Sequence, residues 1–434
     1  MRRLMAWSNF REIVAPPPCD TYPTQVSGID SMNFEDRFLS MDFFVDPYPY
    51  YRYLLENAPV VWSDRVRGWL VSSFDDVQSG LQNSTVFGSG GRIDEAAQSL
   101  SEQAREENAT ALDCLNAMMS FRDAPDHTRL RRLVSKAFTA RRVAGFEPQI
   151  QKIVEELLDS WPRGQEFDLV ETFSFPLPAM VICRMLGIPD ERLGDINRWA
   201  DGIVNLLSAG VMTETAARNA STVVTEASNY LNQLIEEKRS HPSDDLLSAL
   251  VVLEEEEESL SRGELIAMII QLFFAGFETT EGLIGNALSV LLEQADTFEA
   301  LAGNRDFAES TTEEALRYDN SIQRQTRVAR ADVHVQDVLI PQGSYVFFLI
   351  GAANRDPRRF DRPDTFDPSR ADLGSVAFGH GAHFCLGAPL ARLETRIALQ
   401  SIAERYPDLQ MAAKPMYGSL LAVRKPKNLM LRIG

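Results

Sequence analysis

A glycine-rich stretch near the C-terminal end, residues 378–387, contains the side chain best suited to chemistry, Cys385. Glycine allows positive φ values and close approach of the backbone to other groups, and a cysteine thiolate is a metal ligand. Residues 388–394 follow directly and are typical of a helix start, with Pro389 in the first turn. The dipole and free N–H groups at a helix N-terminus stabilise a nearby thiolate. The spacing therefore predicts a tight loop that presents one thiolate just before a helix.

The loop alone permits two other interpretations. Cys385 could be a buried structural cysteine, or it could bind zinc together with His380 and His383. A structural zinc site needs four ligands at characteristic spacings, and no fourth ligand lies nearby in the sequence. The rest of the chain must decide between these interpretations.

The loop resembles the haem-binding loop of the cytochrome P-450 family, whose pattern is Phe, two residues, Gly, three residues, Cys, one residue and Gly. This sequence fills every position of the pattern, with Phe378, Gly381, Cys385 and Gly387. The resemblance implies that Cys385 is the axial ligand of the iron of haem b, and that Phe378, Gly379 and Gly387 bind the cofactor. It also implies that His383 binds a haem propionate, and it leaves His380 without a role.

A second segment carries two cationic side chains on one helix. Pro125, next to acidic residues, marks a helix start, and His127 and Arg131 lie four residues apart on one face of that helix. Such a pair by itself is most often solvated. The segment resembles the propionate-binding helix of the same family, so the resemblance implies that His127, Arg131 and Arg327 bind the two propionate carboxylates.

A capping box at residues 261–264 predicts the start of a helix that continues to about residue 294. About 33 helical residues would span roughly 50 Å, enough to cross the molecule. An acid and a hydroxyl in the middle of this apolar helix, Glu278 and Thr279, are unfavourable in a plain core. They could mark a core kink in which Glu278 pairs with an arginine. The segment resembles the family's oxygen-activation motif, which implies that Glu278 and Thr279 are catalytic and that Ala275 and Gly276 lie at the cofactor.

Glu314 and Arg317 are spaced to meet on one helical face. They resemble the family's Glu-x-x-Arg motif, which implies a structural ion pair, and a buried pair of this kind serves specificity of structure more than net stability. Thr365 stands where many relatives have an arginine that completes the network. Arg355 and Arg370 are the candidates to replace that arginine.

Composition limits the class of protein. The chain has 434 residues, a formal net charge of −19 and 44% hydrophobic residues, so it can bury a large core and is poorly suited to nucleic acid or anionic membranes. Its four cysteines lie far apart, which argues against a disulfide framework and fits a reducing cytoplasm. The longest apolar run, residues 265–277, is shorter than the roughly 18 residues of a membrane helix. We expect a cytoplasmic monomer without a membrane or nucleic-acid partner.

The helix and strand signals predict a mainly helical α+β fold: one large domain over residues 36–434, with small β-sheet regions and an irregular N-terminal extension over residues 1–35. The resemblance places the long central helix over the haem. Two short strands joined by a charged turn are expected at residues 59–62 and 69–72. A hairpin-like pair is expected at 333–338 and 345–350, and a terminal hairpin at 416–434.

The resemblance as a whole implies a haem-thiolate monooxygenase that inserts one oxygen atom from O2 into a lipophilic small molecule, by hydroxylation or epoxidation. The chain has no flavin-binding or iron–sulfur motif, so a separate ferredoxin and ferredoxin reductase are implied. Their docking site is expected near Arg132, Arg392 and Arg396. A peroxide-using or non-oxidative haem-thiolate enzyme and a haem-based sensor or carrier remain alternatives. Candidate substrate contacts are Gln271, Phe274, Ile322, Leu115 and Leu420.

Overall fold

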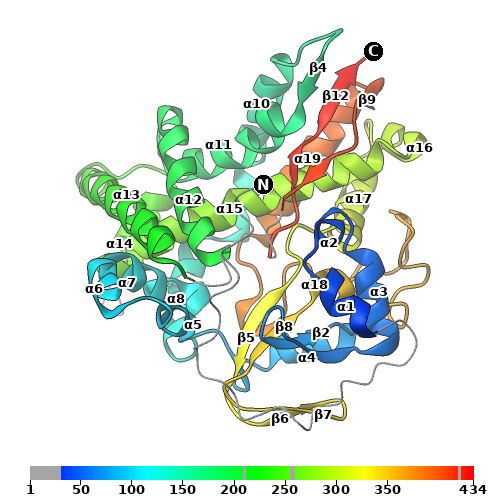
Figure 1. Cartoon of the computed structure of the whole chain (residues 1–434). Coiled ribbons are helices and arrows are strands. Elements are labelled where there is room, and N and C mark those ends of the chain that lie inside the picture. The colour runs from blue at the N-terminus through cyan, green and yellow to red at the C-terminus, as the bar shows by residue number, and fades with distance from the viewer. Residues whose placement is uncertain (1–30, 209–211, 255–259, 419–421) are drawn as a thin grey trace.

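Helices make up most of the molecule, and the sheets are small. The computed structural model describes residues 31–208, 212–254, 260–418 and 422–434. One long helix, α15 (Arg262–Leu291), crosses the middle, the five-stranded sheet lies below it in the view, and other helices lie both above α15 and beside the sheet (Figure 1). The predicted mainly helical α+β fold with one long central helix is confirmed.

Helix α15 begins where the capping box predicts. The Ser261 hydroxyl accepts a hydrogen bond from the backbone N–H of Glu264 at 3.2 Å, and the Glu264 carboxylate accepts one from the N–H of Ser261 at 2.9 Å. The helix packs against α7 (Ala109–Ala117), α11 (Pro176–Met185), α12 (Leu193–Ser208) and α19 (Ala388–Arg405). By length and composition α15 could also cross a membrane, but 56% of its most apolar window is buried inside the protein. Its apolar surface is therefore used by the core.

The remaining helices surround this core. Before α15 they are α1 (Ser31–Arg37), α2 (Met41–Val45), α3 (Tyr48–Asn57), α4 (Phe74–Gln82), α5 (Arg92–Ala97), α6 (Glu102–Glu107), α8 (Asp126–Ala137), α9 (Ala140–Gly145), α10 (Glu147–Asp159), α13 (Glu214–Ser240) and α14 (Leu246–Val252). After it come α16 (Ala295–Glu299), α17 (Arg305–Tyr318) and α18 (Ile350–Ala353). Helix α1 crosses the predicted boundary at residue 35.

The five-stranded sheet has the order β1 (Val60–Ser63), β2 (Gly68–Val71), β8 (Tyr345–Phe348), β5 (Gln325–Ala329) and β3 (Phe87–Gly88). The predicted pairing of the first two strands is confirmed, with Trp62 opposite Trp69. The predicted pairing of residues 333–338 with 345–350 is wrong. Strand β6 (Val333–Val335) instead pairs with β7 (Val338–Ile340), because a two-residue turn with Gln336 at φ 53° reverses the chain at once. Strand β8 joins the larger sheet.

The C-terminal strands return to the body of the molecule. Strand β10 (Met416–Tyr417) pairs with β11 (Pro426–Asn428), which confirms the predicted hairpin, although residues 419–421 between them lie outside the described residues. The last strand, β12 (Met430–Ile433), instead lies between β4 (Glu166–Asp168) and β9 (Leu409–Met411). Strand β11 packs against α15, which brings the C-terminal segment to the central helix.

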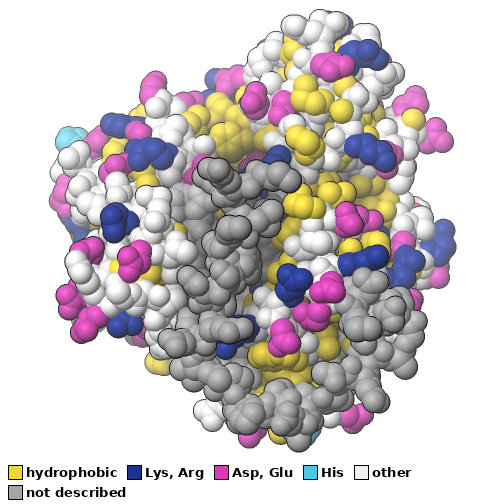
Figure 2. Space-filling model, viewed as in Figure 1, with side chains coloured by type: hydrophobic (Ala, Val, Ile, Leu, Met, Phe, Trp, Pro, Cys, Tyr) yellow, Lys and Arg dark blue, Asp and Glu magenta, His cyan; other side chains and the backbone are white. Residues whose placement is uncertain are grey.

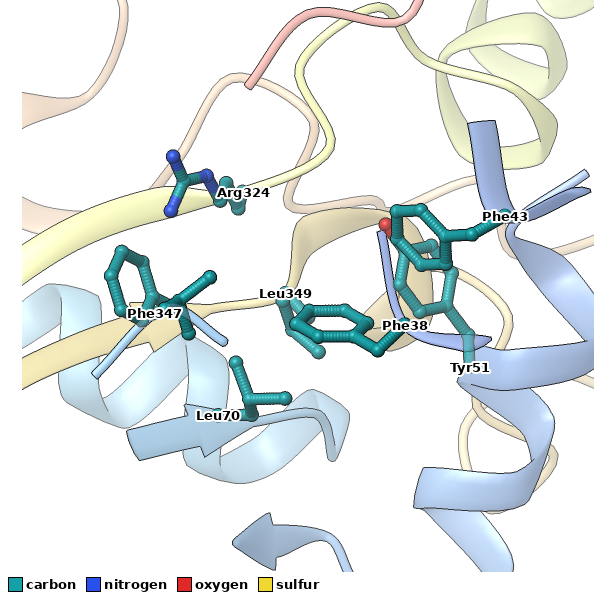
Figure 3. A pocket seen from close by; sticks show the side chains of 8 residues that line it. Phe38, Phe43, Tyr51, Leu70, Arg324, Phe347 and Leu349 are labelled. Carbon is teal, nitrogen blue, oxygen red and sulfur yellow. The ribbon is translucent and has the colours of Figure 1, made fainter. Parts of the chain in front are cut away.

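A smaller core lies where the N-terminal helices meet the five-stranded sheet. Its aromatic side chains include Phe38, Phe43 and Tyr51, and they surround a small pocket that Arg324 also lines (Figure 3). The Arg324 guanidinium lies 4.6 Å from the centre of the Phe347 ring. Because Phe347 and Arg327 belong to neighbouring positions of the β5–β8 ladder, they face opposite sides of the sheet. This pocket is therefore separate from the side that carries Arg327.

Helix α19 contains a buried acid whose effect on stability can be tested. Glu394 is 1% exposed, and its Oε2 has no hydrogen-bond partner. Burial raises the pKa of Glu394 well above its ordinary value of 4.5, so the folded protein holds a proton that the unfolded chain releases. Stability therefore falls as pH rises from about 4.5 towards the folded-state pKa. At pH values above that range, we expect Glu394→Gln to stabilise the protein by about 1–3 kcal/mol.

Thermal unfolding measured from pH 5 to pH 8 checks this expectation. The gain of Glu394→Gln over the parent protein should grow with pH, because the unfolded parent chain releases the Glu394 proton that the folded parent must keep. Glu56→Gln on α3, at an exposed position, is the matched control and should not change the unfolding temperature at either end of this pH series. A gain for Glu394→Gln that is independent of pH would contradict the assignment of a buried, protonated carboxyl.

Candidate functional site

The cysteine loop is built as the sequence predicts. A short turn, η4 (Gly381–His383), precedes Cys385, whose backbone N–H donates to the carbonyl of Phe378 at 2.9 Å. Gly381 has a φ of 70°, and a Cβ there would lie 2.8 Å from the backbone of Gln82 at the end of α4. Gly387 is the N-cap of α19, and Pro389 lies in its first turn. The loop therefore presents one thiol directly before a helix.

The surroundings of Cys385 suit a thiolate that binds a metal ion. Burial raises the pKa of the Cys385 thiol, whereas the N–H groups of Gly387 and Ala388 and the guanidinium groups of Arg131 and Arg392 favour the thiolate and lower this pKa. Cys385 nevertheless keeps an exposed surface. Among the described residues no three His, Cys, Asp or Glu side chains converge as a metal site, so the zinc alternative with His380 and His383 is wrong. Cys385 can thus be one axial ligand of a metal whose other ligands come from a cofactor.

Cationic side chains gather beside the loop, as the propionate hypothesis requires. The rings of His127 and His383 lie 3.9 Å apart, and the Nε2 of His127 is buried without a hydrogen-bond partner. Burial, with the nearby charges of His127 and Arg327, lowers the pKa of His383 to about 3. Burial, with the charge of Arg92, lowers the pKa of Arg327 to about 9. This gathering of arginine and histidine side chains, with a buried ring nitrogen left unpaired, fits the two carboxylates of haem b.

Arg92 is a member of this group that the sequence reasoning missed. Burial lowers its pKa to about 10, its Nε donates to the carbonyl of Ser89 at 3.0 Å, and its guanidinium lies 5.0 Å from the centre of the Phe121 ring. Arg92 is the first residue of α5 and follows Gly91, which has a φ of 72°. A cation in the first turn opposes the helix dipole. That unfavourable position, after a pair of glycines, is the signal that could have identified Arg92.

The middle of α15 places its polar groups on different sides. Thr279 Oγ1 donates to the carbonyl of Ala275 at 3.0 Å, and Thr280 Oγ1 donates to that of Gly276 at 3.2 Å. Ala275 is exposed, although most residues of α15 are buried, so this side of the helix is open to a bound group. Glu278 is buried, and burial raises its pKa. Its cationic partner is a lysine, Lys425, at 3.5 Å, and not the arginine that the core-kink interpretation supposed.

Glu314 and Arg317 form the buried ion pair that their spacing predicts, and both side chains are 0% exposed. Arg317 Nε and Nη2 donate to the two carboxylate oxygens of Glu314 at 2.8 and 2.7 Å. The remaining Arg317 donors reach three backbone carbonyls at 2.8 to 3.0 Å, those of Asn354, Pro363 and Thr365. The pair thus ties α17 to the segment that precedes the cysteine loop.

Arg370 takes the place of the arginine that Thr365 lacks. Its Nε lies 3.5 Å from Glu314 Oε2, and its Nη2 donates to the carbonyl of Thr365 at 3.0 Å. The other candidate, Arg355, is wrong, because it donates to Asp364 and lies between the rings of two tyrosines, Tyr48 and Tyr318. The network around Glu314 therefore contains two arginines.

The candidate substrate contacts do not share one environment. Gln271 and Phe274 are partly exposed on α15, and the Gln271 side chain accepts a hydrogen bond from the N–H of Ser120 at 3.3 Å. Ile322 is also partly exposed. Leu115 is 0% exposed within the main core, so we do not retain it as a substrate contact. Leu420 lies outside the described residues.

The predicted basic docking patch is wrong for two of its three members. The Arg396 side chain is 7% exposed and contacts Glu147 at 2.6 Å, and Arg392 pairs with Glu313 and lies 4.6 Å from the centre of the Phe378 ring. Arg132 is exposed. On the face shown in Figure 2, the described cationic and anionic side chains are intermixed and form no large area of one sign. Neutralisation by neighbouring acids explains the difference from the sequence expectation.

Known proteins resemble this chain over most of its length. Residues 94–432 match the family model described as Cytochrome P450. Cytochrome P450 107B1 of Saccharopolyspora erythraea is 42% identical over 390 residues, which cover 89% of this chain and 93% of that protein. The 6-deoxyerythronolide B hydroxylase of the same organism is 36% identical, and the alignment covers 86% of this chain and 91% of that protein.

Solved structures agree with these sequence relatives. The structure of P450BioI in complex with an acyl carrier protein ligated to hexadec-9Z-enoic acid has a TM-score of 0.83 at 32% identity, and the alignment covers 91% of this chain and all of that chain. CYP109E1 from Bacillus megaterium, in complex with testosterone, has a TM-score of 0.81 at 32% identity, with the same coverage. The cysteine loop and the cations beside it agree with these likenesses, and the chain therefore belongs to the cytochrome P450 family, as a bacterial-type monooxygenase whose cofactor is haem b.

Proposed function

We propose that this enzyme inserts one oxygen atom from O2 into a lipophilic small molecule, by hydroxylation or epoxidation. The observation that carries the proposal is the exposed thiol of Cys385 beside buried arginine and histidine side chains, which include Arg327 and His383. Two relatives that are each 36% identical are named 6-deoxyerythronolide B hydroxylase and vitamin D(3) 25-hydroxylase, which supports a hydroxylation.

Different residues would bind the iron, the propionates and the two faces of the cofactor. Haem b, when bound, supplies the oxygen-activating redox chemistry, and a thiolate ligand favours O–O cleavage. Cys385 would bind the iron, with its thiolate stabilised by the N–H groups of Gly387 and Ala388. Three arginines and two histidines would bind and orient the propionates: Arg92, Arg131, Arg327, His127 and His383. Phe378 and Gly379 would lie on the cysteine side of the cofactor, and Ala275 and Gly276 on the opposite side.

Glu278 and Thr279 would manage protons on the α15 side. The Thr279 hydroxyl can rotate away from the carbonyl of Ala275 and donate a hydrogen bond towards the reacting oxygen. Glu278 is buried and its raised pKa brings proton exchange closer to neutral pH, where a general acid is most effective. The substrate would meet the partly exposed side chains of Gln271, Phe274 and Ile322.

Replacing Thr279 tests this assignment. We expect Thr279→Ala to lower the product formed per electron pair consumed by about tenfold or more, because a positioned proton donor commonly contributes 10²–10⁴-fold. The measurement compares NADPH consumption, product and released hydrogen peroxide, with a lipophilic compound first chosen because it shifts the haem spin state. Thr280→Ala is the matched control, since its hydroxyl donates to the carbonyl of Gly276, and it should stay coupled. Full coupling in Thr279→Ala would contradict the proposed role.

Electrons would come from a separate ferredoxin and ferredoxin reductase in the cytoplasm, and the enzyme would act as a monomer. The sequence has neither a flavin-binding nor an iron–sulfur motif to supply them internally. A peroxide-using enzyme is the second candidate. Adjacent Glu278 and Thr279 favour the O2-dependent reaction, because a reaction that starts from peroxide needs fewer protons delivered. Turnover with peroxide alone, faster than with any ferredoxin system, would favour the second candidate.

A further inference from the structure

Residues 424–426 lie directly across helix α15. A Cβ at Gly282 would lie 2.9 Å from the side chain of Ser321, 3.0 Å from Lys425 Cβ and 3.1 Å from the carbonyl oxygen of Arg424. The side chain of Asn286 donates to the same Arg424 carbonyl at 3.1 Å. The missing side chain at Gly282 thus permits a close crossing, and Asn286 fixes it. The packing of the backbone of residues 424 and 425 on Gly282 therefore determines where Lys425 lies beside α15.

The Lys425 ammonium group is shared between two buried carboxylates of α15. Its Nζ lies 2.8 Å from Glu281 Oε2 and 3.5 Å from Glu278 Oε1. The two acids are three residues apart and therefore lie on the same face of the helix. Asp201, an exposed residue on α12, forms no ion pair with Lys425 in the described part of the chain, but its charge acts on Lys425 and Glu278 from a greater distance. Two buried carboxyl groups and one cation therefore make up a cluster next to Thr279, with Asp201 as a third, more distant acid.

The members of this cluster oppose each other. Burial raises the pKa values of Glu278, Glu281 and Asp201, and the charge of Lys425 lowers all three. Burial lowers the pKa of Lys425 itself, but the two glutamates outweigh it and raise that pKa. Glu281 has the shorter contact with Lys425, so the ammonium group lies nearer to Glu281 and attracts Glu278 less strongly than it would in direct contact. A stronger interaction with Lys425 would favour the ionised form of Glu278, and loss of Lys425 would favour its protonated form.

We propose that Lys425 is a positioning residue whose charge, divided between Glu281 and Glu278, keeps Glu278 able both to hold and to release a proton. This inference rests on the proposed proton-managing function of Glu278 and Thr279. It assigns Glu281 a role as well: this acid competes with Glu278 for the ammonium group and limits how strongly Glu278 is ionised. Asp201 adds a further negative charge from α12 that favours the protonated form of Glu278.

Two substitutions should shift the titration of Glu278 in opposite directions. In Lys425→Met the cation is lost, so we expect the midpoint of Glu278 to move to higher pH by about one unit or more, within the 1–3 units that a nearby opposite charge typically contributes. In Glu281→Gln a neighbouring negative charge is lost and Lys425 can move closer to Glu278, so the titration midpoint of Glu278 should move to lower pH. Lys425→Arg keeps the cation and should stay near the parent value.

The titration is read in the ferric holoenzyme by the infrared carbonyl stretching band of the protonated Glu278 carboxyl, identified by its absence in Glu278→Gln. A second readout is the pH profile of NADPH consumption with a surrogate ferredoxin and reductase, which should move in the same directions. A damaged structure would alter both substitutions alike, so opposite shifts cannot arise from it. Shifts of the same sign, or none, overturn the inference.

The absorption spectrum of the reduced carbon-monoxide complex separates this test from that of the proposed function. Parent protein and variants should all show the strong red shift of thiolate ligation. Absence of that shift in the parent protein would contradict the proposed function itself, whereas an intact shift with an unmoved Glu278 midpoint contradicts only the role of Lys425. If Lys425→Met loses haem, the direction of the shift in Glu281→Gln decides.

Discussion

Cys385→Ala will abolish the red-shifted absorption of the reduced carbon-monoxide complex and lower turnover by more than about 100-fold, which is the upper range for losing even an outer-shell partner of a metal site. No other described cysteine can replace the ligand. Burial raises the pKa of Cys114 and that of Cys183 to about 12, so both remain thiols at neutral pH. Cys385 alone has N–H groups and guanidinium charges that favour the thiolate.

Spectra of the purified variant, reduced and exposed to carbon monoxide, check this result directly. Cys114→Ala is the matched control, because it removes a thiol without touching the loop, and it should keep the red shift and the bound haem. Retention of the red shift in Cys385→Ala would contradict thiolate ligation by this residue. Haem content measured alongside distinguishes loss of the ligand from loss of the cofactor.

Glu314→Gln will cost about 3–5 kcal/mol, because it leaves the Arg317 guanidinium buried without its counter-charge. That cost is a large fraction of the 5–15 kcal/mol that typically stabilises a folded protein. Both side chains are 0% exposed, so water cannot replace the lost interaction. We expect an unfolding temperature lower by on the order of 10 °C, and a lower yield of haem-loaded protein, since the pair ties α17 to the segment before the cysteine loop.

Two further variants test the physical reason. Arg370→Met should cost less than Glu314→Gln, because Arg370 Nε lies 3.5 Å from Glu314 without a hydrogen bond and the other Arg370 donors reach only backbone carbonyls. The double substitution Glu314→Leu with Arg317→Met should recover part of the loss, because apolar side chains of similar volume carry no buried charge. Thermal and denaturant unfolding measure all three. Destabilisation of less than about 0.5 kcal/mol in Glu314→Gln, the range of an ordinary surface substitution, would contradict the assignment.

Sequence reasoning succeeded where the interaction is local. The capping box that begins at Ser261, the loop and helix start around Cys385, and the Glu314–Arg317 pair all depend on residues a few positions apart. Helix geometry and backbone sterics alone determine such arrangements. The structure confirms each of them, together with the mainly helical fold and its long central helix.

The same reasoning failed where partners are distant in the sequence. The partner of Glu278 is Lys425, 147 positions away, and neither residue indicates the other. Strand β8 has the residue types of a strand, but its neighbours β2 and β5 are set by how the whole sheet assembles. Arg396 looks like any exposed arginine in the sequence, yet the packing of α10 against α19 buries it beside Glu147. Such pairings depend on which faces of elements meet.

The contact of the cysteine loop with α4 has a consequence for how the enzyme is made. Gly381 rests on the backbone of residues 81 and 82, so the loop takes its shape against a surface supplied by the N-terminal part of the chain. During synthesis α4 leaves the ribosome long before Cys385 does. The haem-binding loop therefore reaches its final shape only when this late-made segment meets one of the earliest-made helices, so a shortened chain that lacks either segment cannot form it.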